Sequence, residues 1–356
     1  MYQPERKAAS IKSGVRAMFR EDFTRTAKKA EGMSDNAFID AILEERPDLA
    51  GKMAYAPEQG VCAHTVFVGD EVFKTARSND KWTEERSEYF MRGIEREHDI
   101  LQRLNDRGMP VPELTYEGKS FPFFGMTRLS GQRLTPEGLK EMPVKEKESL
   151  AKEIAALCVG ISSAISPEEA KNLGVDVPLP GISFTPQSLQ EALANPDVRK
   201  ALGDNAEFFT QKVREYSDMH HERYAGRAPS FMHADLSPGN ILYDPQTKKL
   251  SGFIDFGVSR VAFPDEGLGV FCMTYPDYFS RMVLKEYSHL QPVQVTREDV
   301  RLWECVYAVN RVAEVAREKP EGWEQRMRNY ADGMREAIAS PPAASSLPRP
   351  QAQKTP

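Results

Sequence analysis

The segment that decides the fold runs from Phe231 to Gly257 and reads FMHADLSPGNILYDPQTKKLSGFIDFG. Asp235 is followed five residues later by Asn240, and Asp255 comes fifteen residues after that. Between Asn240 and Asp255, two β-rich runs flank a polar turn, and this pattern predicts a hairpin over residues 241–254. Because a hairpin brings its two ends together, we expect Asn240 and Asp255 to lie side by side.

The two residues at the ends of this hairpin suit a magnesium ion. The Asn240 amide and the Asp255 carboxylate both offer hard oxygen ligands, and Mg takes few protein groups because water and phosphate oxygens complete its octahedron. Asp235 is then left for an acceptor hydroxyl. A polar turn and a strand end without function would also contain such residues. However, polar residues at this spacing within a strand, loop and strand favour a functional site.

The pattern HxDxxxxN, followed by a hydrophobic strand and IDFG, resembles the catalytic signature of the aminoglycoside phosphotransferase-like kinases, small-molecule kinases of the protein-kinase-like superfamily. The resemblance implies an α+β, two-lobed fold with ATP and Mg in use. A small β-rich N-lobe would carry one long helix, and a larger C-lobe would be mainly helical. Asp235 would orient or deprotonate the acceptor hydroxyl, and His233 would brace its loop. Asn240 and Asp255 would hold Mg.

The N-terminal half contains a second β-rich region. Residues 64–75, HTVFVGDEVFKT, form two short β-rich runs around Gly-Asp and predict a hairpin. A long helical pattern follows, and then ELTYEG and FPFFGMTRL are typical of two more strands. A kinase of this type needs a strand lysine for the α- and β-phosphates of the nucleotide. Lys74 ends the second run, where the resemblance places that lysine.

Helical phase selects a glutamate to hold this lysine. Positions 90, 94, 97, 101 and 104 form one stripe of the long helix, and Glu97 is the only acid on it. An acid on an apolar stripe needs a partner, because burying an unpaired charge is costly. Lys74 is the obvious partner. The segment GIEREHDILQRLNDRGMPVPEL also resembles the corresponding segment of the family, which points to Glu97 as well.

Two further parts of a nucleotide site have weaker signals. Gly60, with His64 nearby, stands where a glycine-rich loop over the phosphates is expected, although a lone glycine before a strand is commonly just a turn. The stretch GMTRLSGQRL resembles the family's linker between lobes, whose backbone would bind adenine. Met126 and Leu129 are the candidates there, although such residues belong to the core in most proteins.

The order of these patterns predicts four regions. They are a helical N-terminal extension (1–50), an N-lobe that binds the nucleotide (51–129), a C-lobe with the catalytic loop and acceptor site (130–338), and a disordered tail rich in Pro, Ala and Ser (339–356). Within the C-lobe region, helices are predicted at 144–165, 186–202, 204–223, 297–317 and 321–338.

Composition excludes several classes of protein. The 356 residues are 40% hydrophobic and 28% charged, as in an ordinary globular protein. A net charge of −6 argues against a nucleic-acid partner, and the chain has no apolar run of membrane-spanning length. The four cysteines lack a CxxC pair, which is typical of buried thiols in a reducing compartment. We therefore expect a cytoplasmic protein.

These patterns together predict an ATP- and Mg-dependent phosphotransferase that acts on a hydroxyl of a small molecule, such as an aminoglycoside-like compound, an amino alcohol or a sugar. Two alternatives stay open: a nucleotide-binding pseudoenzyme or regulatory protein, and a kinase-fold enzyme that acts on a protein or transfers a nucleotidyl group. The acceptor would lie against the helical lobe, near Asp265, Glu266, Asp277 and Glu304. Most acids of this kind are ordinary surface residues.

Overall fold

The computed structural model describes residues 34–55, 63–77, 84–120, 123–175, 186–319 and 321–339. Contacts divide the chain into two compact units. The first comprises the described residues within 1–132, 163–180 and 240–259, and the second those within 133–162, 181–239 and 260–356. Gly60, most of the predicted N-terminal extension and residues 340–356 of the predicted tail lie outside the described ranges.

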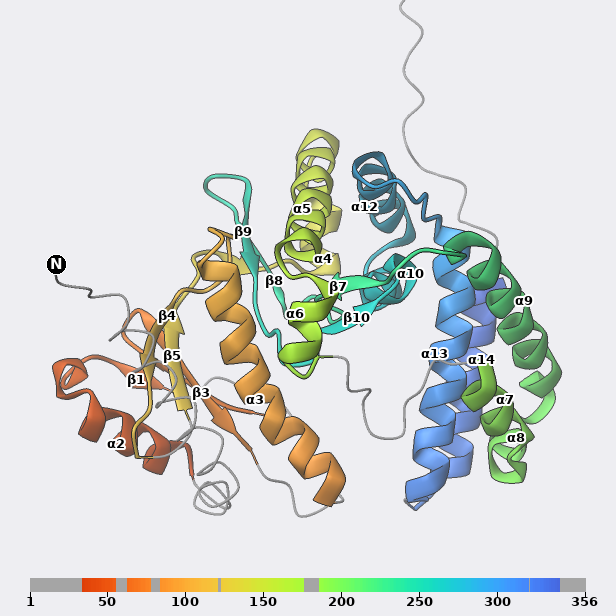
Figure 1. Ribbon diagram of the computed structural model, residues 1–356, viewed down its shortest axis with the longest axis horizontal. Coiled ribbons are helices and arrows are strands. Elements are labelled where there is room, and N and C mark those ends of the chain that lie inside the picture. The colour runs from red at the N-terminus through yellow and green to blue at the C-terminus, as the bar shows by residue number, and fades with distance from the viewer. Residues whose placement is uncertain are drawn as a thin grey trace, which may run out of the picture. The chain divides into compact units, whose positions relative to one another are not determined.

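The first unit contains a five-stranded antiparallel sheet with the order β1-β2-β3-β5-β4 (Figure 1). The strands are β1 (Ala54–Tyr55), β2 (Ala63–Val68), β3 (Glu71–Ala76), β4 (Leu114–Glu117) and β5 (Phe123–Thr127). Strands β2 and β3 form the predicted hairpin, and Gly69 in its turn has a φ of 62°. The two strands predicted after the long helix are confirmed as β4 and β5.

Helices cover both faces of this sheet (Figure 1). Helix α2 (Asp35–Glu45) and the short helix η1 (Pro47–Leu49) contribute Phe38, Ile42 and Leu49 to one hydrophobic cluster with Phe73 of β3. The next residue of β3, Lys74, points to the other face, where it meets helix α3 (Glu84–Asn105). Because successive side chains of β3 point to opposite faces of the sheet, one face packs against apolar residues of α2 and the other presents the charged Lys74 to α3.

A second hairpin completes the first unit. Strands β8 (Ile241–Asp244) and β9 (Lys249–Phe253) pair antiparallel, as the sequence predicts. At its base the Ile254 amide donates to the Asn240 carbonyl at 3.0 Å. Gly252 has a φ of 146°, and a Cβ there would lie 2.4 Å from the Pro110 carbonyl oxygen, so only glycine permits this approach. Helix α6 (Pro167–Asn172) also belongs to this unit, and β6 (Gln132–Arg133) spans the boundary between the units.

The second unit is mainly helical, and α13 (Arg297–Glu318) runs through its centre with α9 (Ala206–Tyr224) and α14 (Trp323–Ala339) alongside (Figure 1). Its core joins Trp303, Val306 and Val309 of α13 to Phe209 of α9. The other elements are α4 (Pro136–Glu141), most of α5 (Val144–Ala164), α7 (Pro186–Ala194), α8 (Pro196–Leu202), η2 (Gly203–Asn205), α9 (Ala206–Tyr224), β7 (Ser230–Met232), β10 (Arg260–Ala262), α10 (Pro264–Gly267), α11 (Gly269–Thr274), α12 (Asp277–Leu290) and α14 (Trp323–Ala339).

One predicted helix is in fact two. The sequence predicts a single helix over 186–202, but α7 ends at Ala194 and α8 begins at Pro196. The side chain of Asn195 between them accepts hydrogen bonds from the amides of Asp197 and Val198. Proline lacks the N–H that a continuous helix would need, whereas Pro at the first position after an Asn cap is favourable.

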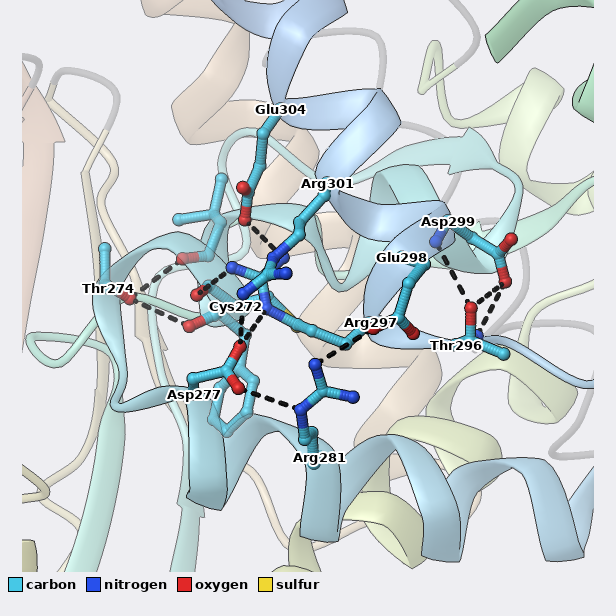
Figure 2. Close-up of polar contacts among 12 residues, drawn as sticks. Cys272, Thr274, Asp277, Arg281, Thr296, Arg297, Glu298, Asp299, Arg301 and Glu304 are labelled. Carbon is cyan, nitrogen blue, oxygen red and sulfur yellow. Dashed lines mark hydrogen bonds and ion pairs between the residues drawn. The ribbon is translucent and has the colours of Figure 1, made fainter. Parts of the chain in front are cut away.

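A network of buried and half-buried charges joins α12 to α13 (Figure 2). Asp277, at the start of α12, contacts guanidinium groups of Arg281, Arg297 and Arg301 at 2.8, 3.0 and 3.4 Å. Arg297 also pairs with Glu304, Nη1 to Oε1 at 2.8 Å, and both side chains are buried. Because an unpaired buried charge is costly, these contacts fix how the two helices pack.

The mixed fold agrees with the predicted α+β class: an antiparallel sheet in the first unit and a mainly helical second unit. Among the described residues, every helix is too short or too polar to cross a lipid bilayer. Cys158, Cys272 and Cys305 are buried free thiols, and burial raises the pKa of each to about 12. Cys62 lies outside the described ranges.

Candidate functional site

The first unit holds a buried ammonium group between two carboxylates. Lys74 Nζ lies 2.6 Å from Glu97 Oε2 and 3.1 Å from Asp255 Oδ1. The Lys74 side chain is 7% exposed and that of Glu97 is fully buried, whereas the Asp255 side chain is 51% exposed. Burial alone lowers the pKa of Lys74, but the charges of Asp255 and Glu97 outweigh burial and raise it. The lysine is therefore a permanent cation.

Glu97 connects the lysine to the turn that carries Asp255. While Oε2 accepts from Lys74, Oε1 accepts from the Phe256 amide at 3.3 Å. On the same helix, Arg96 Nη2 donates to the Gly257 carbonyl at 3.4 Å. The predicted pairing of Glu97 with Lys74 is thus present, and α3 holds both the lysine and the turn. A single helix sets the relative positions of β3 and the IDFG segment.

The hairpin places Asn240 next to Asp255 along the backbone. Ile241 of β8 lies opposite Phe253 of β9, and the bond from the Ile254 amide to the Asn240 carbonyl extends that pairing by one step. Asp255 follows directly, with a left-handed φ of 67° that turns the chain out of the ladder. An amide oxygen and a half-exposed carboxylate at one hairpin end are the donor chemistry that Mg prefers, so these residues fit that ion.

Asp235 lies in the second unit, in the loop that follows β7. Its amide donates to His233 Nδ1 at 3.3 Å, and His233 is 3% exposed. Ala234 between them has a φ of 64°, which costs a non-glycine residue about 1 kcal/mol or more. Strained residues of this kind persist where the surroundings hold them, and they gather at functional sites. This hydrogen bond links His233 to the amide of Asp235, and the bracing role that the resemblance implies for the histidine stays a prediction.

Three of the remaining candidates for nucleotide binding lie in or next to strands of the first unit. Met126 lies in β5 with 5% of its surface exposed, paired with Val72 of β3. Leu129 follows that strand and approaches Gly252 of the second hairpin. His64 lies in β2, where its Nδ1 is 3.0 Å from Asp35 Oδ1 of α2. Gly60 is outside the described residues.

The four acids considered for the acceptor are more enclosed than expected. Asp265 is fully buried, and its Oδ1 accepts from the Tyr224 hydroxyl at 2.6 Å. Burial raises its pKa. Burial also raises the pKa of Glu266 to about 7, although Arg260 opposes the shift. Asp277 and Glu304 belong to the arginine network of Figure 2. The expectation of an ordinary surface position is therefore wrong for Asp265 and Glu304, which are buried, whereas Glu266 and Asp277 are half-buried.

Sequence reasoning missed two residues beside Glu97. Arg96 reaches the Gly257 carbonyl, and His98 contacts Asp99 and Glu117 at 3.1 Å each. Both are buried polar residues on α3. The sequence did contain an indication of both: they are the immediate neighbours of Glu97, and when one residue of a helix faces a sheet its neighbours lie close to the same sheet. The periodicity of apolar residues does not register it, because Arg and His count as polar wherever they point.

Comparison with known proteins adds an independent observation. Residues 60–303 match the model of a protein family described as "Phosphotransferase enzyme family". None of the curated proteins compared with the sequence matches it significantly. The matched range contains Lys74, Glu97, Asp235, Asn240 and Asp255.

Several solved structures have the same fold. The GDP complex of wild-type aminoglycoside 2'-phosphotransferase-IIIa is 22% identical, with a TM-score of 0.66, and the match covers 86% of this chain and 99% of that one. A choline/ethanolamine kinase family protein from Mesorhizobium loti is 15% identical, with a TM-score of 0.59 and coverage of 87% and 96%. Macrolide 2'-phosphotransferase type I is 16% identical, with a TM-score of 0.56 and coverage of 84% and 98%.

Proposed function

This chain belongs to the phosphotransferase enzyme family, and from that premise we propose that it transfers the γ-phosphoryl group of ATP, with Mg, to a hydroxyl of a small molecule. The observation that carries the proposal is the buried Lys74 ammonium, held by Glu97 and Asp255. A phosphoryl-transfer enzyme needs a fixed cation for the nucleotide phosphates and a carboxylate for the metal, and this cluster supplies both.

Each residue of the first unit has a separate role in this proposal. Lys74 binds the α- and β-phosphates, and Glu97 keeps its ammonium in place. Asp255 and Asn240 hold Mg, which when bound neutralises charge on the phosphate oxygens. Asp255 suits this role because its side chain is half-exposed even though Oδ1 contacts Lys74. Met126 and Leu129 are the candidates for the adenine site, and Gly60, outside the described residues, is the candidate for the loop over the phosphates.

Asp235 acts on the acceptor. Its carboxylate accepts a hydrogen bond from the acceptor hydroxyl and takes the proton as the oxygen attacks the γ-phosphorus. A new oxygen–phosphorus bond forms, and the bond from the γ-phosphorus to the bridging oxygen breaks, so ADP leaves with that electron pair. Most of the rate enhancement then comes from positioning and from charge neutralisation rather than from covalent catalysis.

For the acceptor we propose an amino sugar, an amino alcohol or a related hydroxyl compound. The solved structures of the same fold include aminoglycoside and macrolide phosphotransferases and a choline/ethanolamine kinase family protein. Similar solved structures contain GDP, ADP or ATP, so both ATP and GTP need testing as donors. We assign the reaction to the cytoplasm, where nucleoside triphosphates are abundant. The full set of Lys74, Asp235, Asn240 and Asp255 favours an enzyme over a pseudoenzyme.

The test is nucleotide consumption with Mg-ATP and Mg-GTP over a panel of aminoglycosides, macrolides, choline, ethanolamine and sugars. Asp235→Asn should retain nucleotide binding but lose turnover by about 10²- to 10⁴-fold, the usual contribution of a general base. Asp244→Asn is the matched control, because Asp244 lies in the same segment and caps the hairpin turn. If no acceptor is phosphorylated and nucleotide still binds, the chain is a pseudoenzyme. If Asp235→Asn turns over like wild type, the catalytic assignment is wrong.

A further inference from the structure

Two consecutive residues of α3 contact the two residues that flank Phe124 in one row across the sheet. Phe124 of β5 lies opposite Lys74 of β3 on one side and opposite Glu117 of β4 on the other. Glu97 binds Lys74 at 2.6 Å, and His98 Nε2 lies 3.1 Å from Glu117 Oε1. One strand, β5, lies between these contacts, so together they fix both the distance and the rotation of the helix on the sheet.

The His98 ring lies between acids and an aromatic side chain. Nδ1 lies 3.1 Å from Asp99 Oδ1, Nε2 faces Glu117, and the ring centroid is 5.7 Å from that of Phe124 in an edge-on arrangement. The residue is 7% exposed. Both ring nitrogens can donate at once only when the imidazole is protonated. Two flanking carboxylates therefore favour the cation.

Among the described residues, two elements contribute charged groups that face this ring. Asp99 lies on α3 itself and Glu117 on β4, whereas β5 contributes the uncharged Phe124. The nearby cation of β3, Lys74, is already paired with Glu97 and Asp255. Burial alone lowers the pKa of His98, but hydrogen bonds to Asp99 and Glu117 outweigh it and raise the pKa to about 9.

We propose that His98 is a positioning residue for nucleotide binding: as a cation it ties α3 to β4 and thereby holds Glu97 in the position that orients Lys74. The link to nucleotide binding rests on the function proposed for Lys74. The position of α3 also determines whether the Phe256 amide can donate to Glu97. The contact of His98 with Glu117 therefore supports both bonds of Glu97, the one from Lys74 and the one from Phe256. Without the contact between His98 and Glu117, the contact between Glu97 and Lys74 alone would link the helix to this row.

The direction of the pH effect follows from the raised pKa. The imidazolium brace is complete below the ordinary histidine pKa of about 6.5 and is lost as the pH rises through about 9. The affinity of the wild-type chain for nucleotide should therefore fall between about pH 8 and pH 10. A variant that cannot gain a proton at position 98 should lack that fall.

The experiment is calorimetric titration of the full chain with MgADP, which requires no acceptor. His98→Gln keeps a hydrogen-bonding side chain without the charge and should weaken MgADP binding about tenfold at pH 7, the lower end of what residues that orient a binding group contribute. Glu117→Gln should have the same effect, and the double variant should add little to either. Arg107→Gln is the control, since it removes an exposed ion pair with Glu169 just beyond the end of α3.

The outcomes separate this inference from the function on which it rests. If Lys74→Met binds MgADP like wild type, or wild type does not bind it, the proposed function fails. If Lys74→Met weakens binding while His98→Gln and Glu117→Gln match Arg107→Gln, only the role of His98 is wrong. Should His98→Gln be poorly folded, the wild-type and Glu117→Gln pH series still decide. Equal pH dependence of MgADP affinity in both would overturn the proposal.

Discussion

Each unit of the molecule buries a cluster of charges, and the two clusters are balanced differently. In the first unit one cation, Lys74, faces two carboxylates, and the Asp255 side chain is 51% exposed. In the second unit three guanidinium groups and three carboxylates pair with one another, and the Arg297–Glu304 pair has side-chain exposures of 9% and 5%. The members of that network are Arg281, Arg297, Arg301, Asp277, Glu298 and Glu304.

This difference separates a site from a structural contact. Within the described residues the Lys74 cluster sets one cation against two carboxylates, one of them half-exposed, and such a group can bind a further cation. The arginine network is balanced within itself, so it gains nothing from a ligand and instead fixes the packing of α12 and α13. Buried ionic side chains alone therefore do not mark a site. The balance of charge and the exposure of one partner do.

The largest expected effect is on stability, in the arginine network. Arg297→Ala leaves Glu304 buried without its partner and should lower the free energy of unfolding by about 3–5 kcal/mol. Urea denaturation measures this loss, and MgADP affinity below the unfolding transition should stay unchanged. The double variant with Glu304→Gln should recover part of the stability, because no charge is then left unpaired. A loss below about 1 kcal/mol would mean that the network is not structural.

Asp255 should behave in the opposite way. Asp255→Asn removes a half-exposed carboxylate and leaves the buried Lys74 paired with Glu97, so the free energy of unfolding should change by less than about 1 kcal/mol. Turnover should fall by about 10²- to 10³-fold, because the cluster loses a metal ligand and one partner of Lys74. Steady-state kinetics with Mg-ATP and urea denaturation, with Asp244→Asn as control, give both values. A large stability loss with intact turnover would contradict the comparison.

A smaller effect is expected at Glu266, which is half-buried beside Tyr216 without belonging to either cluster. The Tyr216 hydroxyl lies 3.3 Å from Glu266 Oε1, and burial raises the pKa of the acid to about 7. Its proton stabilises the folded chain at low pH, and that stabilisation is lost as the pH rises from about 4.5 through 7. Glu266→Gln should remove this dependence and stabilise the chain by roughly 1–2 kcal/mol at pH 8. Thermal unfolding at pH 5 and pH 8 checks it, and an unchanged slope would exclude Glu266 as its source.

Local patterns predicted the hairpins and the charged partner of Lys74. Gly69 and the turn at 244–249 are strong local signals, and each hairpin pairs residues that are near in sequence. Glu97 followed from helical phase, because an acid on the stripe that faces the sheet needs a cation. The same reasoning could not specify roles, which depend on a nucleotide and an acceptor, so those assignments stay predictions.

Long-range pairing escaped prediction. Nothing local to Asp277 indicates that Arg297 will bind it, because twenty residues and a helix end separate them. His98 and Glu117 pair across a helix and a strand in the same way. Asp265 lies in a Phe-Pro-Asp-Glu-Gly stretch typical of an exposed turn, yet α10 buries it against Tyr224. The break at Asn195 was missed because the apolar spacing continues across it.

The packing of α2 has a consequence for exchange of segments between relatives. Similarity to the family begins at residue 60, whereas Phe38, Ile42 and Leu49 of the preceding segment share one apolar cluster with Phe73. A chimera joined at the edge of that similarity would cut through a hydrophobic core and leave one face of the sheet bare. A segment to be exchanged as one folded piece should therefore begin no later than Ser34, the N-cap of α2, although the sequence match to the family begins only at residue 60.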